Sequence, residues 1–223
     1  MSHTVISQIC LAYLLQFDTS EPLDINVDAC FPLAKYAAQH WILHSQFGSK
    51  TESQSSSVFA LMMKLLTKEN MAFVSWVQLC DVDDSDCLNL QKEKAKIAKP
   101  LYYTIIAGLT EAAYALLDME VDVNGQGGKY GTALQAASYK GHEAIAKLLV
   151  EKGADINAQG GEYGNALQAA SHKGHEAIAK LLIKKGADVN AQGGYYRDAS
   201  YQGHEAIAKL LMQKGVLQSP TNC

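Results

Sequence analysis

The chain contains a nearly exact internal repeat. Residues 130–162 read YGTALQAASYKGHEAIAKLLVEKGADINAQGGE, and residues 163–195 follow at once as YGNALQAASHKGHEAIAKLLIKKGADVNAQGGY. The 33-residue period extends upstream, because Gly108, Gly141 and Gly174 are 33 residues apart. Downstream, Gly203 follows Gly174 by only 29 residues, so the last copy lacks about one helical turn. Such a period is the signature of an architecture in which copies of one helical or hairpin unit stack on each other.

Each copy predicts two short helices and a turn. Thr132 is a suitable N-cap for a first helix, and Gly141 suits its end, because glycine adopts a left-handed conformation without strain. In the second helix, Ile145, Leu148 and Leu149 recur at i, i+3 and i+4 and form one apolar stripe. A single helix pair cannot bury this stripe, so neighbouring copies must pack on one another. We therefore expect an all-α fold, with an N-terminal helical domain followed by an α-solenoid with short hairpin loops.

The repeated run carries a family resemblance. Residues 133–149 (ALQAASYKGHEAIAKLL) and their second copy resemble ankyrin repeats, with residues 132–135 (TALQ) and 165–168 (NALQ) where that family usually has Thr-Pro-Leu-His. The resemblance covers about residues 100–215 and implies stacked helix pairs that bind other proteins. Gln135 and Gln168 replace the family's histidine, whose ring ties neighbouring turns together. The hydrogen bonds of that histidine are therefore not expected to carry over unchanged.

A second resemblance concerns longer proteins. The Gln-Gly-Gly-x-Tyr-Gly spacing between copies resembles the ankyrin arrays that end many fungal NLR-like proteins of the NACHT class. Residues 7–14 (SQICLAYL) and 31–41 (FPLAKYAAQHW) are similar to the helical segment that joins the nucleotide-binding module to the repeats in those proteins. The alternative function that this implies is the ligand-sensing C-terminal part of an ATP-dependent switch. Its nucleotide-binding domain is absent from this chain, and the abrupt end of the chain is similar to a truncated member of that type.

The predicted domains follow from these patterns. Residues 1–98 are expected to form a helical connector or cap domain, with helices over 4–17, 31–47, 58–66 and 72–79. A serine-rich loop over 48–57 and an acidic linker over 81–86 are expected between them. The repeats occupy 99–216 as four units, 99–131, 132–164, 165–196 and a truncated 197–216, and 217–223 are a tail.

Composition narrows the class of function. Eight basic and 11 acidic residues precede Pro100, and 11 and 12 follow Lys99, so neither part has the basic excess that nucleic-acid binding needs. No apolar run approaches the roughly 20 residues of a membrane span, and the first residues lack the basic start of a secretory signal. Five cysteines fit reduced thiols rather than a disulfide framework. We expect a cytoplasmic protein that binds neither nucleic acid nor membrane.

A calcium loop is suggested by Asp81 and Asp83, but the pattern fails. The sixth position is Asp86 where glycine is needed, and the twelfth is Lys92 where a bidentate glutamate is needed. A solvated acidic linker is the expected alternative.

The histidines do not form a predicted site either. His40 and His44 are four residues apart on a helix, which could place two imidazoles on one metal ion, yet no third ligand has an identifiable spacing. His142, His175 and His204 repeat with the scaffold and have no fixed nucleophile partner, so a structural role is expected. We predict no catalytic residue, no metal and no cofactor, and hence a protein that is not an enzyme.

What remains is a binding surface for another protein. Three sets of equivalent positions are candidates for this surface. The first set lies at the hairpin tips and changes charge and shape between copies, and the second set is the tyrosine that follows each tip. The third set lies near the end of the first helix of each copy. In that order the nine residues are Lys129, Glu162 and Tyr195; Tyr130, Tyr163 and Tyr196; and Tyr139, His172 and Tyr201. Tyrosine offers a large contact area and a hydroxyl at low entropic cost. The alternative for Tyr130 and Tyr163 is packing between copies.

The expected function is a non-enzymatic protein-interaction scaffold, in signalling or in self/non-self recognition. The uncovered face of the last copy also predicts fraying or self-association through this C-terminal repeat.

Overall fold

The computed structural model describes residues 2–19, 23, 30–47, 52–67, 71–83, 90, 92–93, 96–191 and 205–213. Their regular structure is helical, and the extended pairing among them is an isolated bridge between Gly160 and Gly164. The predicted all-α class is confirmed. The chain divides into two compact units, Met1–Leu116 (unit 1) and Leu117–Cys223 (unit 2). None of the helices in these residues is long and apolar enough to cross a membrane.

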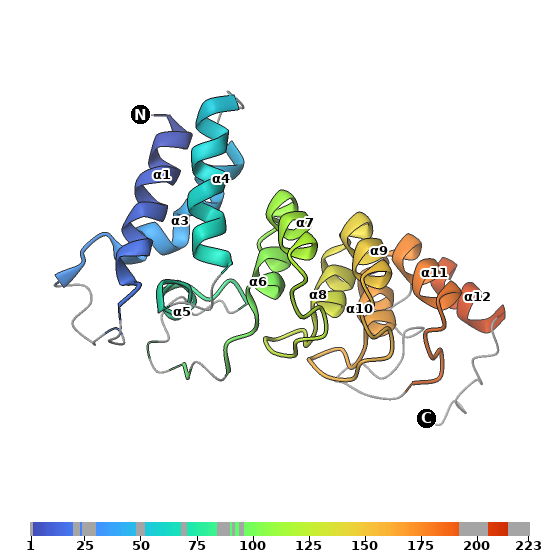
Figure 1. Ribbon diagram of the computed structural model, residues 1–223. Helices are drawn as coiled ribbons and strands as arrows, with labels where there is room; N and C mark the ends of the chain where they lie inside the picture. The colour runs from blue at the N-terminus through green and yellow to red at the C-terminus, as the bar shows by residue number, and fades with distance from the viewer. Residues whose placement is uncertain are drawn as a thin grey trace. The chain divides into compact units, whose positions relative to one another are not determined.

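Unit 1 contains α1 (His3–Leu14) with the 3-10 turn η1 (Leu15–Phe17), α3 (Ala34–Phe47), α4 (Glu52–Leu66), α5 (Met71–Leu79), α6 (Pro100–Ile106) and most of α7 (Thr110–Asp118). Helix α1 packs along α3 and α4 (Figure 1). The predicted helices are present, but α3 begins at Ala34 rather than at residue 31, and at α4 the loop predicted over 48–57 is wrong for its second half. The helix begins at Glu52 because helix formation is cooperative. The turns that bury Val58, Met62 and Leu65 extend back through serines, which tolerate a helix.

The core of unit 1 is an aromatic cluster formed by Trp41, Phe73, Trp76 and Tyr103, each at most 2% exposed. The ring centroids lie 5.3 Å apart for Trp41 and Trp76 and 5.8 Å apart for Phe73 and Tyr103, with edge-on geometry. Trp76 Nε1 donates to the carbonyl oxygen of Ala38 over 3.2 Å, which satisfies its buried polar atom. Because Tyr103 comes from α6, the first predicted repeat contributes to this core. The boundary predicted at residue 98 remains a prediction based on the repeat pattern.

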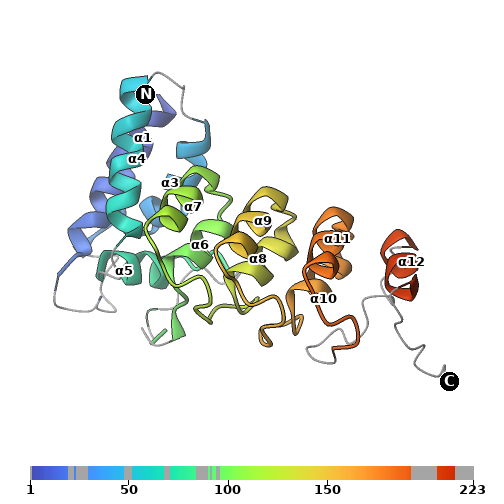
Figure 2. The same ribbon diagram turned by 45° about the vertical axis from the view of Figure 1, so that its right-hand side comes forward.

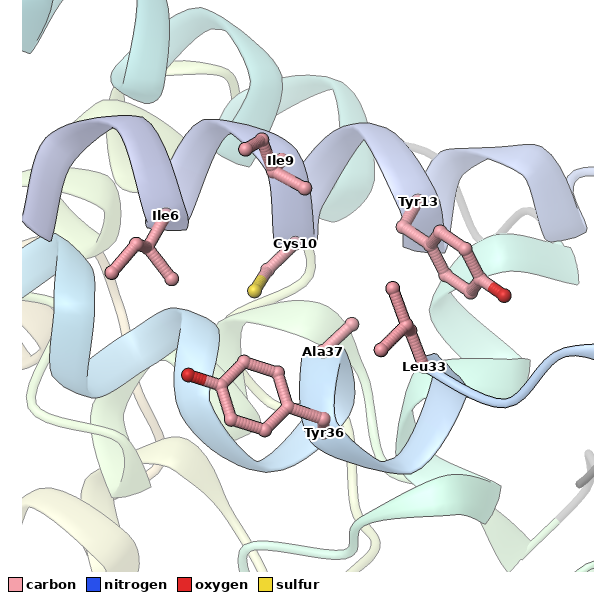
Figure 3. Close-up of a pocket in the computed structure, with 7 residues that line it drawn as sticks. All are labelled: Ile6, Ile9, Cys10, Tyr13, Leu33, Tyr36 and Ala37. Atoms are coloured by element: carbon pink, nitrogen blue, oxygen red, sulfur yellow. The ribbon is translucent and has the colours of Figure 1, made fainter. Parts of the chain in front are cut away.

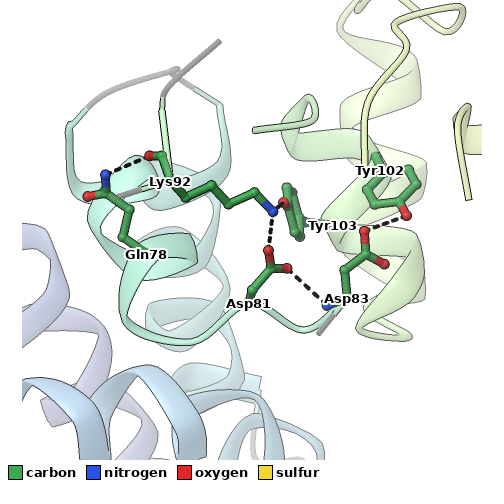
Figure 4. Close-up of polar contacts among 6 residues, drawn as sticks. All are labelled: Gln78, Asp81, Asp83, Lys92, Tyr102 and Tyr103. Carbon is green, nitrogen blue, oxygen red and sulfur yellow. Dashed lines mark hydrogen bonds and ion pairs between the residues drawn. The ribbon is translucent and has the colours of Figure 1, made fainter. Parts of the chain in front are cut away.

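The segment after α5 is anchored by a polar network (Figure 4). Asp81 is 4% exposed and forms an ion pair with Lys92, and it accepts a hydrogen bond from the backbone N–H of Asp83. Tyr102 donates to Asp83 Oδ2 over 2.6 Å. The prediction of a solvated linker is therefore wrong at Asp81, because the ammonium of Lys92 makes burial of this carboxylate tolerable. Burial and the nearby carboxylates Asp81 and Asp83 raise the pKa of Tyr103.

Unit 2 contains α8 (Ala133–Lys140), α9 (Glu143–Glu151), α10 (Ala166–Lys173), α11 (Glu176–Lys184) and α12 (Glu205–Gln213). Helices α8 and α10 lie side by side in one row, and α9, α11 and α12 form a second row (Figure 2). Ile145 and Ile178 are 2% and 1% exposed, which confirms that the copies pack through their aliphatic stripes. Within the stripe, Leu149 is fully buried while Leu148 is only half-buried.

The helix ends follow the sequence prediction. Thr132 and Gln135 form a capping box, in which the Gln135 N–H donates to Thr132 Oγ1 and the Thr132 N–H donates to Gln135 Oε1. Gly141 ends α8 with a φ of +78°. A side chain at this position would collide with the ring of His175, and His175 Nε2 lies 3.1 Å from the carbonyl oxygen of Tyr139. The repeated histidine therefore acts structurally here, by joining one copy to the previous one.

Two sets of amide side chains connect neighbouring copies. Gln135 Nε2 lies 3.0 Å from the carbonyl oxygen of Gly160 and 2.9 Å from that of Gly164. The glutamine thus bonds to the next hairpin, and the doubt that the missing histidine raised about bonding between turns is removed at this position. Asn124 Nδ2 donates to the carbonyl of Gly153 over 3.2 Å, while Asn124 Oδ1 accepts from the N–H of Asp155 over 2.7 Å.

The same asparagine contacts recur one copy later, where Asn157 bonds to Gly186 and Asp188 over 3.2 and 2.8 Å. The spacing of the sequence repeat therefore reappears as a ladder of hydrogen bonds.

Candidate partner-binding site

Two adjacent hairpin tips position the candidate site. The first closes with a hydrogen bond from the Gly127 N–H to the Gly131 carbonyl, and the second with the same bond from Gly160 to Gly164, at 3.0 and 2.8 Å. Gly161 has a φ of +63°, and a Cβ there would collide with the backbone of Tyr130. The second tip therefore lies directly against the first, with glycine required at the contact.

The predicted tip residues Lys129 and Glu162 contact each other. Lys129 Nζ lies 3.5 Å from Glu162 Oε2, and the Glu162 N–H donates to the Lys129 carbonyl over 2.9 Å. Their side chains are 50% and 30% exposed, so the pair lies at the surface. In the sequence, this position changes from lysine to glutamate between neighbouring copies. In the fold, the two side chains form an ion pair between neighbouring tips.

Three tyrosines gather beside the tips, and we call Tyr130, Tyr139 and Tyr163 the tyrosine stack. Ring centroids lie 4.2 Å apart for Tyr130 and Tyr139, with nearly parallel planes, and 5.0 Å apart for Tyr139 and Tyr163. The His172 ring continues the stack at 4.9 Å from Tyr163. Tyr130 and Tyr163 are 7% and 6% exposed, so both take part in packing between copies. Tyr139 and His172 are half-buried and present part of their surface to solvent.

The structure thus brings together the six predicted residues that it describes. Tyr195, Tyr196 and Tyr201 lie outside the described residues.

Electrostatics single out Tyr139 within the stack. Burial alone would raise its pKa, but hydrogen bonds from the hydroxyls of Tyr163 and Tyr130 and the charge and hydrogen bond of Lys173 outweigh burial and lower it. Burial, the bond to Tyr139 and the charge of Glu162 raise the pKa of Tyr163. The Tyr139 hydroxyl is therefore the one that contacts both other hydroxyls of the tyrosine stack and the ammonium of Lys173.

Two lysines lie over the same ring. Lys173 Nζ is 4.7 Å from the centroid of Tyr139, and Lys140 Nζ is 5.9 Å from it. These are cation–π distances. The arrangement offers aromatic surface, hydroxyls and positive charge, which suits recognition by contact.

Unit 1 contains a histidine contact that the sequence did not predict. His3 Nδ1 and His44 Nδ1 share a hydrogen bond of 2.8 Å, and the Tyr36 hydroxyl lies 3.3 Å from His44 Nε2. Partial burial, then the charges of His3 and His40, lower the pKa of His44. Within the described ranges, no group of three histidine, cysteine or acidic side chains is placed to hold a metal ion. No local pattern could reveal this contact, because the partners are 41 residues apart.

An apolar cavity of about 280 Å³ lies between α1 and α3 (Figure 3). Its lining residues come from the two helices and the turn before α3, and they are Ile6, Ile9, Cys10, Tyr13, Leu33, Tyr36 and Ala37. Ile9 and Leu33 are 49% and 52% exposed, and burial raises the pKa of the Cys10 thiol. The apolar spacing of these helices indicated a core, and spacing alone does not distinguish a covered face from an open one.

Comparisons with known proteins agree with the repeat architecture. Residues 134–183 match the family described as ankyrin repeats (many copies). The chain is 37% identical over 162 residues to the azaphilone pigments biosynthesis cluster protein L of Monascus ruber, a match that covers 67% of this chain and 33% of that relative. The chain therefore spans about one third of the length of the curated relative that it matches. Together with the stacked helix pairs, the family match identifies ankyrin repeats over residues 134–183.

Proposed function

We propose that this chain is a non-enzymatic protein-interaction module that binds a partner protein through the hairpin tips and the open side of the tyrosine stack. One observation carries the proposal: the six described residues that differ between copies or follow the tips lie together where two repeats meet, and four of them are at least partly open to solvent. Ankyrin repeats commonly mediate protein–protein interaction, which supports the same conclusion. Tyr195, Tyr196 and Tyr201 are proposed to extend the surface by one further copy.

The buried and open parts of this surface have different tasks. Tyr130 and Tyr163 are almost fully buried and hold the two tips together, so their removal would disturb the fold. Tyr139 and His172 are half-buried at equivalent positions near the ends of α8 and α10. Half-buried aromatic rings on a rigid scaffold lose little entropy on binding and provide large contact areas. We therefore assign most of the contact to Tyr139 and His172 and the rim to Lys129 and Glu162.

The test is affinity capture from an extract of the source organism, quantified by mass spectrometry. The variant Tyr139→Ala/His172→Ala is expected to lose the captured partner. The charge swap Lys129→Glu/Glu162→Lys keeps the ion pair and the fold but reverses the charges that a partner meets, so it should weaken capture. A matched control, Glu143→Ala/Lys147→Ala, changes two exposed residues of α9. Circular dichroism checks that each variant is folded, and full capture by both site variants would overturn the proposal.

A second candidate function is the ligand-sensing C-terminal part of an NLR-like, ATP-dependent switch, in signalling or in self/non-self recognition. The observation that favours it is the length of the Monascus ruber relative, two thirds of which lies outside the match. We expect no ATP binding by the chain itself in isothermal titration calorimetry with magnesium, because it contains no predicted nucleotide-binding module. Saturable binding of ATP would favour the switch.

Three further assignments are proposals of the same kind. We propose that this chain has no catalytic activity, although the relative is named for a biosynthesis cluster. A cytoplasmic location is proposed from the sequence. Self-association through the C-terminal repeat is also proposed, although Ile207 and Leu211 of α12 are buried in the chain itself. Analytical ultracentrifugation that found only monomer at high concentration would exclude it.

A further inference from the structure

We infer that the surface at the ends of α8 and α10 takes an acidic peptide segment of the partner, whose carboxylates are held by Lys140 and Lys173. The inference rests on the proposed function and specifies the chemistry of the partner. It depends on the local distribution of charge, which differs from that of the whole chain.

The exposed ends of α8 and α10 carry positive charge without any acid. The two helices read ALQAASYK and ALQAASHK, with no aspartate or glutamate, and their first six residues are buried. The residues that remain accessible are the half-buried Tyr139 and His172 and the exposed Lys140 and Lys173. Because the lysines are 33 residues apart, stacking of the copies places them in neighbouring rungs of the same row.

These two lysines have no carboxylate partner among the described residues. Other lysines of unit 2 do: Lys129 pairs with Glu162, Lys152 with Asp118, and Lys180 with Glu176. A lysine in the last turn stabilises its own helix through the macrodipole, which accounts for the residue type. The macrodipole does not account for the direction of the side chains, which both lie over the ring of Tyr139.

The two ammonium groups lie near one aromatic ring. Lys173 Nζ and Lys140 Nζ are 4.7 and 5.9 Å from the Tyr139 centroid, so two like charges are held near one another. The ring quadrupole compensates part of their repulsion. One or two carboxylates of the partner would offset these two positive charges, while the partner's neighbouring apolar side chain would contact the open side of the stack. The geometry therefore fits a short segment in which acidic and apolar residues alternate.

A polyanion such as nucleic acid fits this surface less well. The positive patch consists of two lysines, Glu162 lies on its rim, and the chain has a net charge of -4. Long phosphate backbones are bound by extended basic surfaces, and a net negative protein repels them at long range. A peptide with one or two carboxylates avoids this repulsion because it meets only the local field.

The experiment is selection from a random peptide library displayed on phage, with the intact chain as bait. Peptides rich in aspartate and glutamate are expected, and their binding should weaken as salt is raised. By fluorescence anisotropy, Lys140→Gln/Lys173→Gln should weaken the best peptide by roughly 2- to 30-fold, as expected for two exposed charge pairs. Lys140→Glu/Lys173→Glu should select basic peptides instead. The matched control Lys147→Gln/Lys184→Gln removes the same charge from α9 and α11 and should leave binding unchanged.

The outcomes separate the inference from the proposed function. Selected peptides that are neutral or basic, that bind the Lys140→Gln/Lys173→Gln variant equally well and that are lost in Tyr139→Ala would overturn the inference and leave the proposed function standing. Peptides that bind Tyr139→Ala as tightly as the unchanged chain would overturn both. Recovery of no acidic peptide also counts against the inference. A single-stranded DNA oligonucleotide that displaces the best peptide at equal concentration would assign the surface to nucleic acid.

Discussion

The two units of this chain are stabilised in different ways. Unit 1 is held by contacts that occur once, between aromatic residues far apart in the sequence, as in the pair formed by Trp41 and Trp76. Unit 2 is held by contacts that recur, as in the hydrogen bonds of Asn124 and Asn157 to the copy that follows each. Repeated contacts leave a repeated pattern in the sequence, whereas single contacts leave none. The accuracy of the sequence predictions differs between the units for this reason.

The surfaces of the two units differ as well. Among the described residues, eight large apolar side chains are exposed, and six of them lie between residues 9 and 47. None of the eight comes from the described residues at 120–191 or 205–213. Unit 1 thus has an apolar surface beside a well-packed core, while the described part of unit 2 exposes mainly polar and charged side chains, with Met119 as the exception. The following predictions test this comparison, in order of decreasing effect.

The largest effect is expected for Trp76→Ala in unit 1. Trp76 is fully buried, and its removal leaves a cavity beside Trp41 and Phe73, so the free energy of unfolding should fall by about 3–5 kcal/mol. Both tryptophans of the chain lie in unit 1, so the fluorescence of Trp41 follows this unit alone. Hydrogen exchange should show lost protection in α3 and α5 with α8–α11 unchanged. Equal loss in both units would show that they unfold together.

A smaller loss is expected for Gly161→Ala in unit 2. The positive φ and the collision with Tyr130 should together lower the free energy of unfolding by about 2–4 kcal/mol. The control is Gly153→Ala, since Gly153 also has a positive φ but a Cβ there meets no atom within 4 Å. Urea titration followed by circular dichroism measures both variants. Equal losses would show that backbone strain alone decides the cost and that the tips do not require close contact.

A further comparison lies within unit 2. Gln135→Ala removes a capping contact and bonds to two carbonyls of the next hairpin, so we expect a loss of about 1–3 kcal/mol. Among the described residues, the Gln168 side chain makes one hydrogen bond, to the Ala191 carbonyl, and its Oε1 accepts none. For Gln168→Ala we therefore expect a loss of about 1 kcal/mol in the free energy of unfolding. Urea titration of the two variants measures the difference. A larger loss for Gln168→Ala would contradict the unequal roles that the two glutamines have in their copies of the repeat.

The smallest effect on stability is expected for Lys173→Met, which should change a pKa instead. Removal of the ammonium should raise the pKa of Tyr139, because the phenolate loses its nearby positive charge. Tyr139 deprotonates more easily in the folded chain, so its contribution to stability is fully present above the unfolded pKa of about 10 and is lost as pH falls through the lower folded pKa. Stability at neutral pH should be unchanged. Ultraviolet absorption at alkaline pH checks the shift, and Lys147→Met is the control.

The sequence predicted most of unit 2 and part of its candidate site. The caps at Thr132 and Gly141 and the burial of Ile145 follow from local rules, so they were correct. The neighbourhood of Lys129 and Glu162 followed from their equivalent positions, but their ion pair did not. The role of Gln135 was not predicted, because the replacement of a histidine by glutamine does not by itself reveal which carbonyl oxygens the amide reaches.

In unit 1 the sequence predicted helices but not their partners. The burial of Asp81 depends on Lys92, whose contact requires the intervening chain to return, and no local pattern encodes this. The contact of His3 with His44 and the open face of α1 were missed for the same reason. Charge and spacing describe a residue's own helix or turn and do not specify what the rest of the chain places against it.

By itself, the sequence determined that the chain is helical, where the repeated helix pairs begin and end, and that successive copies must stack. Periodicity is sufficient for this because neighbouring copies bury one another's aliphatic stripes in the same way each time. Only the tertiary structure decided which tyrosines are buried, which lysines converge on Tyr139 and which acids are paired. These properties depend on the distances between side chains from different copies or helices, and such distances are fixed only when the whole unit packs.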